Sequence, residues 1–440
     1  MAAKRMETSA ETTITDLPSD PLLLILAGLP PSDLQSVSLV SKSFLSLSNR
    51  FIRKLTFRSL PSDCSFRKIF TRFSCVKEVA IDSTRIGRAL TAISSSALNL
   101  ESLQISGFPS YPKQHHLLRL SGKFEKLKAL SLWWFSKVGV DQIVEFIQLF
   151  PALEELDFKG SGEWNDVGIE KLSSKVPNLR KIDLSGNKKL TDRALDALSK
   201  NCVNLEDVCL EDHTELTPQG LCAFLRKRPN LKSIVLPNFV VLSPSELLPV
   251  AEGLSNCKNL SHFSFGRTMA KDDFLCTIAK SRSTLKTLKI LCRQDQDPAY
   301  TIPGLSATLV AFQGLERLEV CLPHPSRNSC TDVKMSQLVK CLPCLKDIFV
   351  QSCYYTLYKT LFSLIENCPL LESICLHCLE ISHNDRSDRH APPSLTRRNY
   401  SIKCISLLPR PDEALKIVLK SFCPSVKRWN AVRSGLTLPY

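Results

Sequence analysis

The chain has 440 residues, of which 43% are hydrophobic and 23% charged, and its 57 Lys and Arg against 43 Asp and Glu give a formal net charge of +14. This is the composition of a globular protein and excludes a largely disordered chain. The 18 Cys are spread over the whole length, which excludes a small disulfide-stapled scaffold and predicts free thiols in a reducing compartment.

The N-terminal segment shows no apolar stretch of the signal-peptide type, and residues 1–12 are predicted to be disordered. The longest apolar run, Leu22 to Leu29, is far shorter than the about 20 residues that a membrane-spanning helix needs. We therefore expect no membrane association, and a location in the cytoplasm, the nucleus or both.

Residues 13–50 predict three short helices. In the first, Ser19 suits the N-cap and Pro30 the end, and apolar residues at 22, 25, 26 and 29 form one helical face. The second helix is expected to start at Ser32 and the third to carry Phe44. A segment of about forty residues is marginal alone, so its surplus apolar surface must be covered by the rest of the chain or by a partner.

This segment resembles the F-box, which docks on a Skp-type adaptor in Skp–cullin–F-box ubiquitin ligases. The resemblance is carried by the opening Leu-Pro, the leucine-rich first helix, LPPSDL at residues 29–34 and LVSKSF at residues 39–44. Ser41, Phe44 and Pro21 differ from the Cys, Trp and aliphatic residue that are usual in the family. The resemblance implies that the residues binding the adaptor are Leu17, Pro18, Leu22, Ile25, Leu26, Leu29, Asp33, Leu34, Leu39, Val40, Lys42 and Phe44.

From residue 51 to residue 440 the dominant feature is a repeat. An apolar-x-x-apolar-x-apolar pattern recurs, and its copies starting at Leu153, Leu179, Leu205 and Leu231 are 26 residues apart. A leucine-rich helical protein would place Leu every three or four residues without such a reset. The pattern starts fourteen times, at Ile52, Val76, Leu100, Leu127, Leu153, Leu179, Leu205, Leu231, Leu260, Leu285, Leu315, Leu345, Leu371 and Ile402.

Each copy of the pattern is followed by a turn and a helix. After Leu184, for example, Thr191 suits an N-cap, and the unit closes with Asn201-Cys202. Such units resemble leucine-rich repeats of the cysteine-containing subclass. We predict an α/β solenoid of about fourteen repeats, with a parallel sheet inside and helices outside, preceded by the F-box. Insertions are expected near residues 107–119, 292–304 and 378–400.

Alternate strand positions are expected to face the concave surface of the solenoid. These positions hold six Lys or Arg and nine Asp or Glu, so a basic groove for nucleic acid is excluded. Trp133 is expected to face the concavity and Trp134 to turn inward. We predict a protein substrate with a basic element and an apolar anchor, bound by Trp133, Glu155, Asp157, Asp183, Asp207, Glu211, His262, Phe349 and His377.

Two CxxC pairs, at residues 341–344 and 375–378, superficially resemble a zinc site. The repeat aligns Cys375 with Phe349, five residues beyond Cys344, an offset of about 16 Å along a strand. Thiolates must lie about 2.3 Å from one zinc ion, so we expect no metal site, and we expect no cofactor.

No phosphate-binding Gly-rich loop, nucleophile elbow or HExxH motif occurs in the sequence, so we expect no enzyme. Together, the F-box and the repeats resemble the F-box/leucine-rich-repeat substrate receptors of ubiquitin ligases, and in particular the plant members of that family. The resemblance implies a monomer that binds a Skp-type adaptor, and through it cullin, and recruits a protein substrate for degradation. The alternative is a repeat scaffold or ligand sensor that acts without ubiquitin transfer; related receptors bind a hormone and an inositol phosphate.

Overall fold

The computed structural model describes residues 18–58, 63–82, 86–106, 124–133, 139–161, 164–237, 244–266, 269–281, 284–291, 300–322, 332–352, 358–378, 397–408 and 413–429. Contacts divide the chain into two units, residues 1–131 with 149–152 and residues 132–148 with 153–440. Within the described part, no helix is long and apolar enough to cross a membrane.

The first unit begins with three short helices, α1 (Ser19–Ala27), α2 (Pro31–Ser38) and α3 (Lys42–Asn49). Their core is built from Leu22, Leu26 and Phe44, against which the partly buried Leu29, Leu34, Val37, Leu47 and Phe51 pack. The first helix starts at Ser19 itself, and Pro18 precedes it as a cap without a side-chain hydrogen bond. Ser19 therefore is not the N-cap, contrary to the expectation, because the extended backbone that a cap requires falls on the proline.

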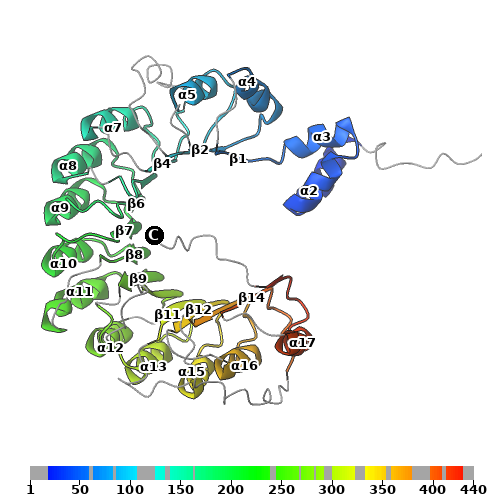
Figure 1. Ribbon diagram of the computed structural model, residues 1–440. Helices are drawn as coiled ribbons and strands as arrows, with labels where there is room; N and C mark the ends of the chain where they lie inside the picture. Colours follow the sequence, from blue (N-terminus) through cyan, green and yellow to red (C-terminus); the bar gives the residue numbers. More distant parts are fainter. Residues whose placement is uncertain are drawn as a thin grey trace, which may run out of the picture. The chain divides into compact units, whose positions relative to one another are not determined.

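Strand–helix repeats follow in the first unit. Strands β1 (Lys54–Phe57), β2 (Glu78–Asp82) and β3 (Ser102–Ser106) pair in parallel, with Lys54 opposite Glu78 and Glu78 opposite Ser102. Helices α4 (Asp63–Arg72) and α5 (Ile86–Ser94) follow β1 and β2 and cover one side of them (Figure 1). Strand β4 (Ala129–Trp133) begins in this unit and ends in the second.

The second unit continues the same alternation, and within each unit the order of the strands in the sheet is that of the chain. Figure 1 shows its helices following one another on one side of the strands. The strands are β5 (Glu155–Asp157), β6 (Lys181–Asp183), β7 (Asp207–Cys209), β8 (Ser233–Val235), β9 (His262–Gly266), β10 (Thr287–Leu291), β11 (Arg317–Cys321), β12 (Asp347–Ser352), β13 (Ser373–Cys378), β14 (Cys404–Leu408) and β15 (Arg428–Trp429).

The helices of the second unit lie between these strands in sequence. They are α7 (Val140–Ile147), α8 (Asp166–Lys175), α9 (Asp192–Asn201), α10 (Pro218–Arg226), α11 (Pro244–Asn256), α12 (Asp272–Ser281), α13 (Ile302–Ala311), α15 (Asp332–Leu338), the 3₁₀ turn η2 (Val339–Cys341), α16 (Tyr358–Asn367) and α17 (Glu413–Phe422). We call the face of each strand that points away from these helices the open face.

The repeat read from the sequence is confirmed as a parallel sheet whose strands alternate with helices where the intervening residues are described. Each predicted pattern start lies just before a strand, and neighbouring starts are in register: Glu155 pairs with Lys181, and Lys181 with Asp207. One further strand was missed. β15 follows Val426, where the pattern reads Val426-x-x-Trp429-x-Ala431, so a small alanine stands at the third apolar position and the signature is weaker than in the other repeats.

The apolar positions of the pattern form the core. Leu179, Ile182 and Leu184 are fully buried, because they fill the space between the sheet and the helices of neighbouring repeats. After β5, β6 and β7 the chain enters a tight turn with a left-handed residue, which is Gly160, Gly186 and Asp212 respectively. Glycine suits these turns since it adopts positive φ without steric cost.

The expected insertions fall mostly outside the described residues. Of the segment expected at 292–304, the described part from residue 300 onward already leads into α13, so this insertion is shorter than predicted. Thr301 caps that helix by accepting a hydrogen bond from the amide of Gly304. At 397–400, Asn399 is buried and its amide donates to the carbonyls of Ile365 and Cys368.

The residue after the pattern start alternates in charge along two stretches of the second unit, from Glu154 to Lys232 and from Lys286 to Lys403, with the uncharged Ser261 between them. Glu206 lies between Arg180 (2.6 Å) and Lys232 (2.8 Å). Glu316 lies between Lys286 (3.2 Å) and Lys346 (2.7 Å), and Glu372 then pairs with Lys403 (2.7 Å). The cations lower the pKa values of these carboxyl groups, first through hydrogen bonds, from Lys232 to Glu206 and from Lys346 to Glu316. Five Lys and Arg side chains are therefore paired with carboxylates along this edge of the sheet.

Candidate binding surfaces

The three N-terminal helices leave large apolar side chains in solvent. Leu24 and Ile25 on α1 are 77% and 48% exposed, and Leu39 and Val40 after α2 are 84% and 71% exposed. Isolated exposed apolar residues are ordinary, but four within seventeen residues of a small domain indicate a surface that binds a partner. We call these four residues the apolar surface of the N-terminal helices.

The position of Leu39 and Val40 is fixed by the start of the third helix. Ser41 adopts an extended backbone and its hydroxyl accepts a hydrogen bond from the amide of Phe44 at 3.1 Å, which makes it the N-cap of α3. Phe44 is buried beside Leu26, so the first turn of α3 is held from both sides. Ser41 replaces the cysteine usual in the F-box, and in this chain it has a structural role as a cap.

The structure divides the residues expected to bind the adaptor. Ile25, Leu39 and Val40 are exposed, as are Pro18, Asp33 and Lys42. In contrast, Leu22, Leu26 and Phe44 form the core of the three helices, and Leu29 and Leu34 are partly buried against it. These five residues hold the domain together, which leaves little of them for a partner to touch. Leu17 lies outside the described residues.

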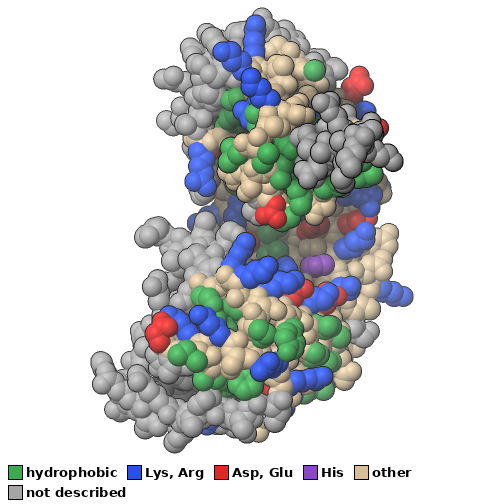
Figure 2. Space-filling view, turned by 90° about the vertical axis from the view of Figure 1, so that its right-hand side faces the viewer, with side chains coloured by type: hydrophobic (Ala, Val, Ile, Leu, Met, Phe, Trp, Pro, Cys, Tyr) green, Lys and Arg blue, Asp and Glu red, His purple; other side chains and the backbone are tan. Residues whose placement is uncertain are grey.

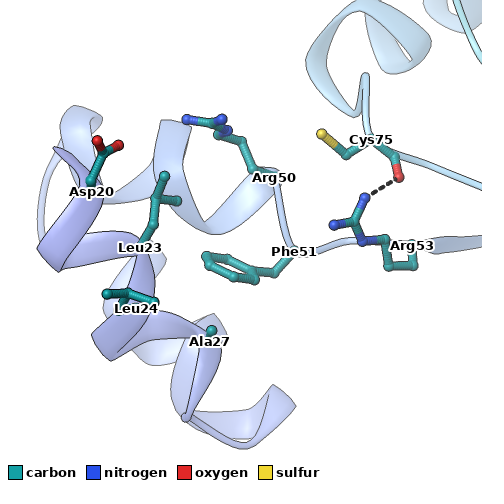
Figure 3. Close-up of a pocket in the computed structure, with 8 residues that line it drawn as sticks. All are labelled: Asp20, Leu23, Leu24, Ala27, Arg50, Phe51, Arg53 and Cys75. Atoms are coloured by element: carbon teal, nitrogen blue, oxygen red, sulfur yellow. Dashed lines mark hydrogen bonds between the residues drawn. The ribbon is translucent and has the colours of Figure 1, made fainter.

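Leu24 is not among the residues that the sequence led us to expect at the adaptor surface. It is more exposed than Ile25, the other exposed large apolar residue described on α1. Its segment, SDPLLLILA, is apolar on every side of the helix, so helical periodicity could not show which face points inward. Leu24 also lines an open pocket of about 470 Å³ in the first unit (Figure 3). The other lining residues are Asp20, Leu23, Ala27, Arg50, Phe51, Arg53 and Cys75.

The pocket combines an apolar wall with positive charge. Leu23 and Phe51 lie on the apolar side, while Arg53 donates a hydrogen bond to the carbonyl of Cys75 at 3.0 Å (Figure 3). This hydrogen bond links the segment between α3 and β1 to the start of β2. Arg50 and Arg53 therefore lie in the same pocket as Leu24, which belongs to the apolar surface of the N-terminal helices.

A second candidate surface is the open face of β5, β6 and β7. The strand register places Glu155, Lys181 and Asp207 in one row and Asp157, Asp183 and Cys209 in the next. Lys181 lies 3.8 Å from Asp207, which partly offsets the negative charge of the first row. In the second row burial raises the pKa of Asp157, and the negative charge of Asp183 acts in the same direction. Four carboxylates therefore lie on the open face of these strands, with Lys181 between Glu155 and Asp207.

The remaining residues expected to bind substrate lie on other strands. Trp133 is half-buried at the end of β4, Glu211 is half-buried after β7, and His262 is exposed at the start of β9. Farther along, the phenyl ring of Phe349 meets the imidazole of His377 edge to face, with ring centroids 5.4 Å apart. Phe349 is buried there, so it supports His377 and exposes little apolar surface of its own. Trp134 lies outside the described residues.

The structure thus brings together two separate groups on the open face, the acidic residues of β5–β7 and the Phe349–His377 pair of β12 and β13. Figure 2 shows Lys and Arg side chains spread over the visible surface with Asp and Glu between them. The alignment of Cys375 with Phe349 is confirmed by the pairing of β12 with β13. No cluster of three or more metal-ligating side chains occurs among the described residues.

Residues 14–56 match the F-box domain. The chain therefore contains an F-box domain, followed by strand–helix repeats. The F-box comprises α1, α2 and α3, so the apolar surface of the N-terminal helices is a surface of the F-box. The repeats begin with β1, within the last residues of the match.

Solved structures resemble this chain at low sequence identity. A structure of the yeast Rad7 and Elc1 complex matches with 14% identity and a TM-score of 0.45, covering 89% of this chain and 91% of the other. A TLR13–ssRNA13 complex matches with 16% identity, a TM-score of 0.43 and coverages of 77% and 53%. The leucine-rich-repeat protein LegL7 from Legionella pneumophila matches with 11% identity and a TM-score of 0.41, covering 68% of this chain and 90% of the other. No curated protein matches the chain.

Proposed function

We propose that this protein is a substrate-recognition subunit of a Skp–cullin–F-box ubiquitin ligase. Its F-box binds a Skp-type adaptor, which connects it to cullin, and its repeats bind a protein substrate. The match of residues 14–56 to the F-box domain carries the proposal. The protein contributes no catalytic group; it acts by raising the effective concentration of the substrate near the ubiquitin-conjugating enzyme.

The exposed part of the F-box defines the adaptor contact that we propose. Leu24, Ile25, Leu39 and Val40 supply apolar area, and the buried Leu22, Leu26 and Phe44 keep the helices that present it in place. Burying a large apolar side chain stabilises an interface by about 1.5–3 kcal/mol. Four such residues therefore account for a stable association with an apolar partner surface.

Binding of the adaptor is tested by co-purification of the full-length protein with a Skp-type adaptor. Leu39→Glu should lower recovery of the adaptor at least tenfold, because a carboxylate would replace the most exposed apolar side chain of the F-box. Deleting residues 1–50 should abolish recovery. Val203→Glu, at an equally open position in the repeats (65% exposed), is the matched control and should bind as the wild type does.

Two outcomes would reject this function. If the wild-type protein fails to recover the adaptor, or if deletion of residues 1–50 changes nothing, the repeats act as a binding scaffold or ligand sensor without ubiquitin transfer. If the Leu39→Glu variant recovers the adaptor normally, the adaptor does not contact the end of α2. Thermal melting of each variant separates loss of binding from loss of folding.

The substrate surface that we propose is the open face of the repeats. The acidic residues of β5–β7 suit a basic element of the substrate, and the half-buried Trp133 suits an apolar anchor. Affinity capture with a proteasome inhibitor, comparing the wild type with the F-box-deleted form, identifies the substrate. Reversing the charges of Glu155, Asp157, Asp207 and Glu211 should then weaken its binding; unchanged binding would exclude the acidic surface.

A further inference from the structure

Several cysteines of the repeats have an evident structural role. Cys202 and Cys368 close their repeats, and both are fully buried. The thiol sulfur of Cys368 lies 3.6 Å from the carbonyl oxygens of Val339 and Leu342 in the preceding repeat. Burial raises the pKa of the Cys202 thiol to about 11 and that of Cys368 to about 12. These thiols stay protonated at neutral pH and are therefore poor nucleophiles.

Two other cysteines lie on the open face, at the same position of their repeats. Cys209 on β7 is the fourth residue after Leu205, and Cys375 on β13 is the fourth after Leu371. The strand register confirms the placement, since Cys209 pairs with Asp183 and Cys375 with Phe349. The two thiols thus share the same backbone setting and differ in their neighbours.

The surroundings of Cys209 suppress ionisation. Its sulfur lies 2.9 Å from the hydroxyl oxygen of Ser185, and Asp183 occupies the adjacent strand. Burial raises the pKa of the Cys209 thiol to about 12, and the negative charges of Asp183 and Glu211 act in the same direction. A thiolate at this site would face two carboxylates.

Cys375 has an imidazole in place of these carboxylates. Its sulfur lies 3.1 Å from Nε2 of His377, two residues along the same strand. The same nitrogen lies 3.2 Å from the hydroxyl oxygen of Ser406 on β14. The contact with Phe349 on β12 supports the other side of the imidazole ring. A thiol and a ring nitrogen at this separation form the arrangement in which a histidine takes the proton of a cysteine.

The neighbouring strands place one carboxylate and one further thiol near this pair. The open-face positions directly opposite Cys375 carry Phe349 on β12 and Ser406 on β14, and Asp347 and Cys404 lie two residues earlier on these strands. Asp347 is the carboxylate among them, and its Oδ2 lies 3.2 Å from Nε of Arg317. The positive charge of Arg317 therefore offsets the negative charge of Asp347.

We propose that Cys375 is a modification site, a thiol that His377 activates towards small uncharged electrophiles. In the reaction with iodoacetamide, the sulfur lone pair forms a bond to the methylene carbon, the carbon–iodine bond breaks, and iodide leaves. The thiol proton passes to Nε2 of His377. Because only 3% of Cys375 is exposed, the site selects small reagents. An adduct there adds bulk to the open face beside His377 and Phe349.

The test measures the alkylation rate of each cysteine in the folded full-length protein. Iodoacetamide is added at pH 7, samples are quenched over time, and remaining thiols are labelled after denaturation with heavy iodoacetamide. Mass spectrometry of the peptides gives the rates. We expect Cys375 to react at least tenfold faster than Cys209, its matched counterpart on β7. Equal rates for the two cysteines, or no reaction of Cys375, would overturn the proposal.

Substitution of the histidine separates activation from simple access. In His377→Gln the side chain keeps a hydrogen-bonding group but cannot take a proton, so we expect the rate at Cys375 to fall about tenfold at pH 6.5 and much less at pH 8.5. His262→Gln, on exposed His262 of β9, is the control and should leave the alkylation rate at Cys375 unchanged. An unchanged rate in His377→Gln at both pH values would also overturn the proposal.

The pH dependence of the alkylation rate at Cys375 tests the proposal in the wild-type protein, without any substitution. An isolated thiol with a pKa of about 8.5 loses reactivity about tenfold for each pH unit below that value. A thiol paired with an imidazole keeps its reactivity down to the pKa of the pair. We therefore expect the rate at Cys375 to change less than threefold between pH 8 and pH 7, and a tenfold fall would contradict activation by His377.

Discussion

Thr217 binds Asp192 of the preceding repeat through two hydrogen bonds. The amide of Thr217 donates to Oδ1 of Asp192 at 2.9 Å, and its hydroxyl donates to Oδ2 at 2.6 Å. The same hydroxyl caps α10 by accepting from the amide of Gly220 at 3.0 Å. Since Asp192 is the first residue of α9, one threonine ties together the starts of two consecutive helices. The equivalent pairs Thr191–Asp166 and Thr301–Asp272 show the same pattern.

Thr217→Val should destabilise the second unit by about 1–2 kcal/mol, since it removes both the N-cap and a hydrogen bond to a carboxylate. Urea unfolding followed by circular dichroism measures the effect. Thr214→Val is the matched control, because the Thr214 hydroxyl contacts only the exposed Glu215 at 3.3 Å. Equal losses for the two variants would contradict a specific role of the Thr217–Asp192 pair.

Gly220→Ala should also destabilise the second unit, by about 1–3 kcal/mol, because the added methyl group overpacks a tight contact. A Cβ at this position would lie 2.0 Å from Cγ of Asp192, and Asp192 is held in place by Thr217. The comparison is Gly314→Ala, where a Cβ meets nothing within 4 Å. Melting temperatures of the two variants should differ by several degrees; similar values would mean that Asp192 moves aside freely.

Arg228 occupies the position at which other repeats close with cysteine. Its guanidinium is buried and donates to the carbonyls of Leu198 (2.9 Å) and Ser199 (2.8 Å), at the end of α9. In the preceding repeat Cys202 meets the carbonyl of Ser173, which is equivalent to Ser199, and also that of Val176. A positive charge at a helix C-terminus is favourable, although burial lowers the pKa of this arginine.

Arg228→Ala should destabilise the protein by about 2–4 kcal/mol, since it leaves a cavity and buried carbonyls without a donor. Arg228→Cys should cost less than half as much, because cysteine can take the place that Cys202 has one repeat earlier. Chemical unfolding of both variants provides the measurement. If the cysteine variant were the less stable one, the equivalence of the two positions would be wrong.

The burial of His213 predicts that the free energy of unfolding falls at acid pH. It is fully buried in the turn after β7, and its Nδ1 donates to the carbonyl of Leu210 at 2.9 Å. Burial lowers its pKa from the ordinary value of 6.5. The folded state therefore binds the proton less readily than the unfolded state does, and stability is full above about pH 6.5 and falls as the pH drops towards the lowered pKa.

His213→Asn should remove part of this pH dependence. Asn187 occupies the same position one repeat earlier and donates to the carbonyls of Leu184 (2.7 Å) and Phe158 (3.2 Å), so asparagine preserves the turn. We expect similar melting temperatures at pH 7.5 and a smaller drop at pH 5 than in the wild type. The exposed His262 serves as control, and His262→Asn should keep the wild-type profile. An unaltered acid profile in His213→Asn would assign the sensitivity to other groups.

The sequence predicts the repeats well because their signal is redundant. Leu179, Ile182 and Leu184 must all be buried in one unit, and the same demand returns 26 residues later. The F-box was harder to interpret in detail. The run from Leu22 to Leu26 is apolar on every side of α1, so only packing against Phe44 decides that Leu22 and Leu26 point inward and Leu24 outward.

The contacts between repeats were not predictable from a single repeat. Thr191 was expected to be an N-cap, and it accepts from the amide of Arg193, but its hydrogen bonds to Asp166 depend on how two helices stack. The pairing of Cys375 with His377 is a similar case. Both residues lie on the open face by their spacing, yet only the side-chain conformations bring the sulfur within 3.1 Å of the ring nitrogen.

The alternating charges at the sheet edge have a consequence for how such a chain can grow or shrink. From Lys286 through Glu316, Lys346 and Glu372 to Lys403, cation and anion take turns from one repeat to the next. Loss or duplication of one repeat in this stretch would place like charges side by side, whereas loss or duplication of two would keep every neighbour opposite in sign. Duplication, recombination or protein design can therefore exchange two repeats at a time in this stretch and keep the charges alternating, whereas exchange of a single repeat breaks the alternation.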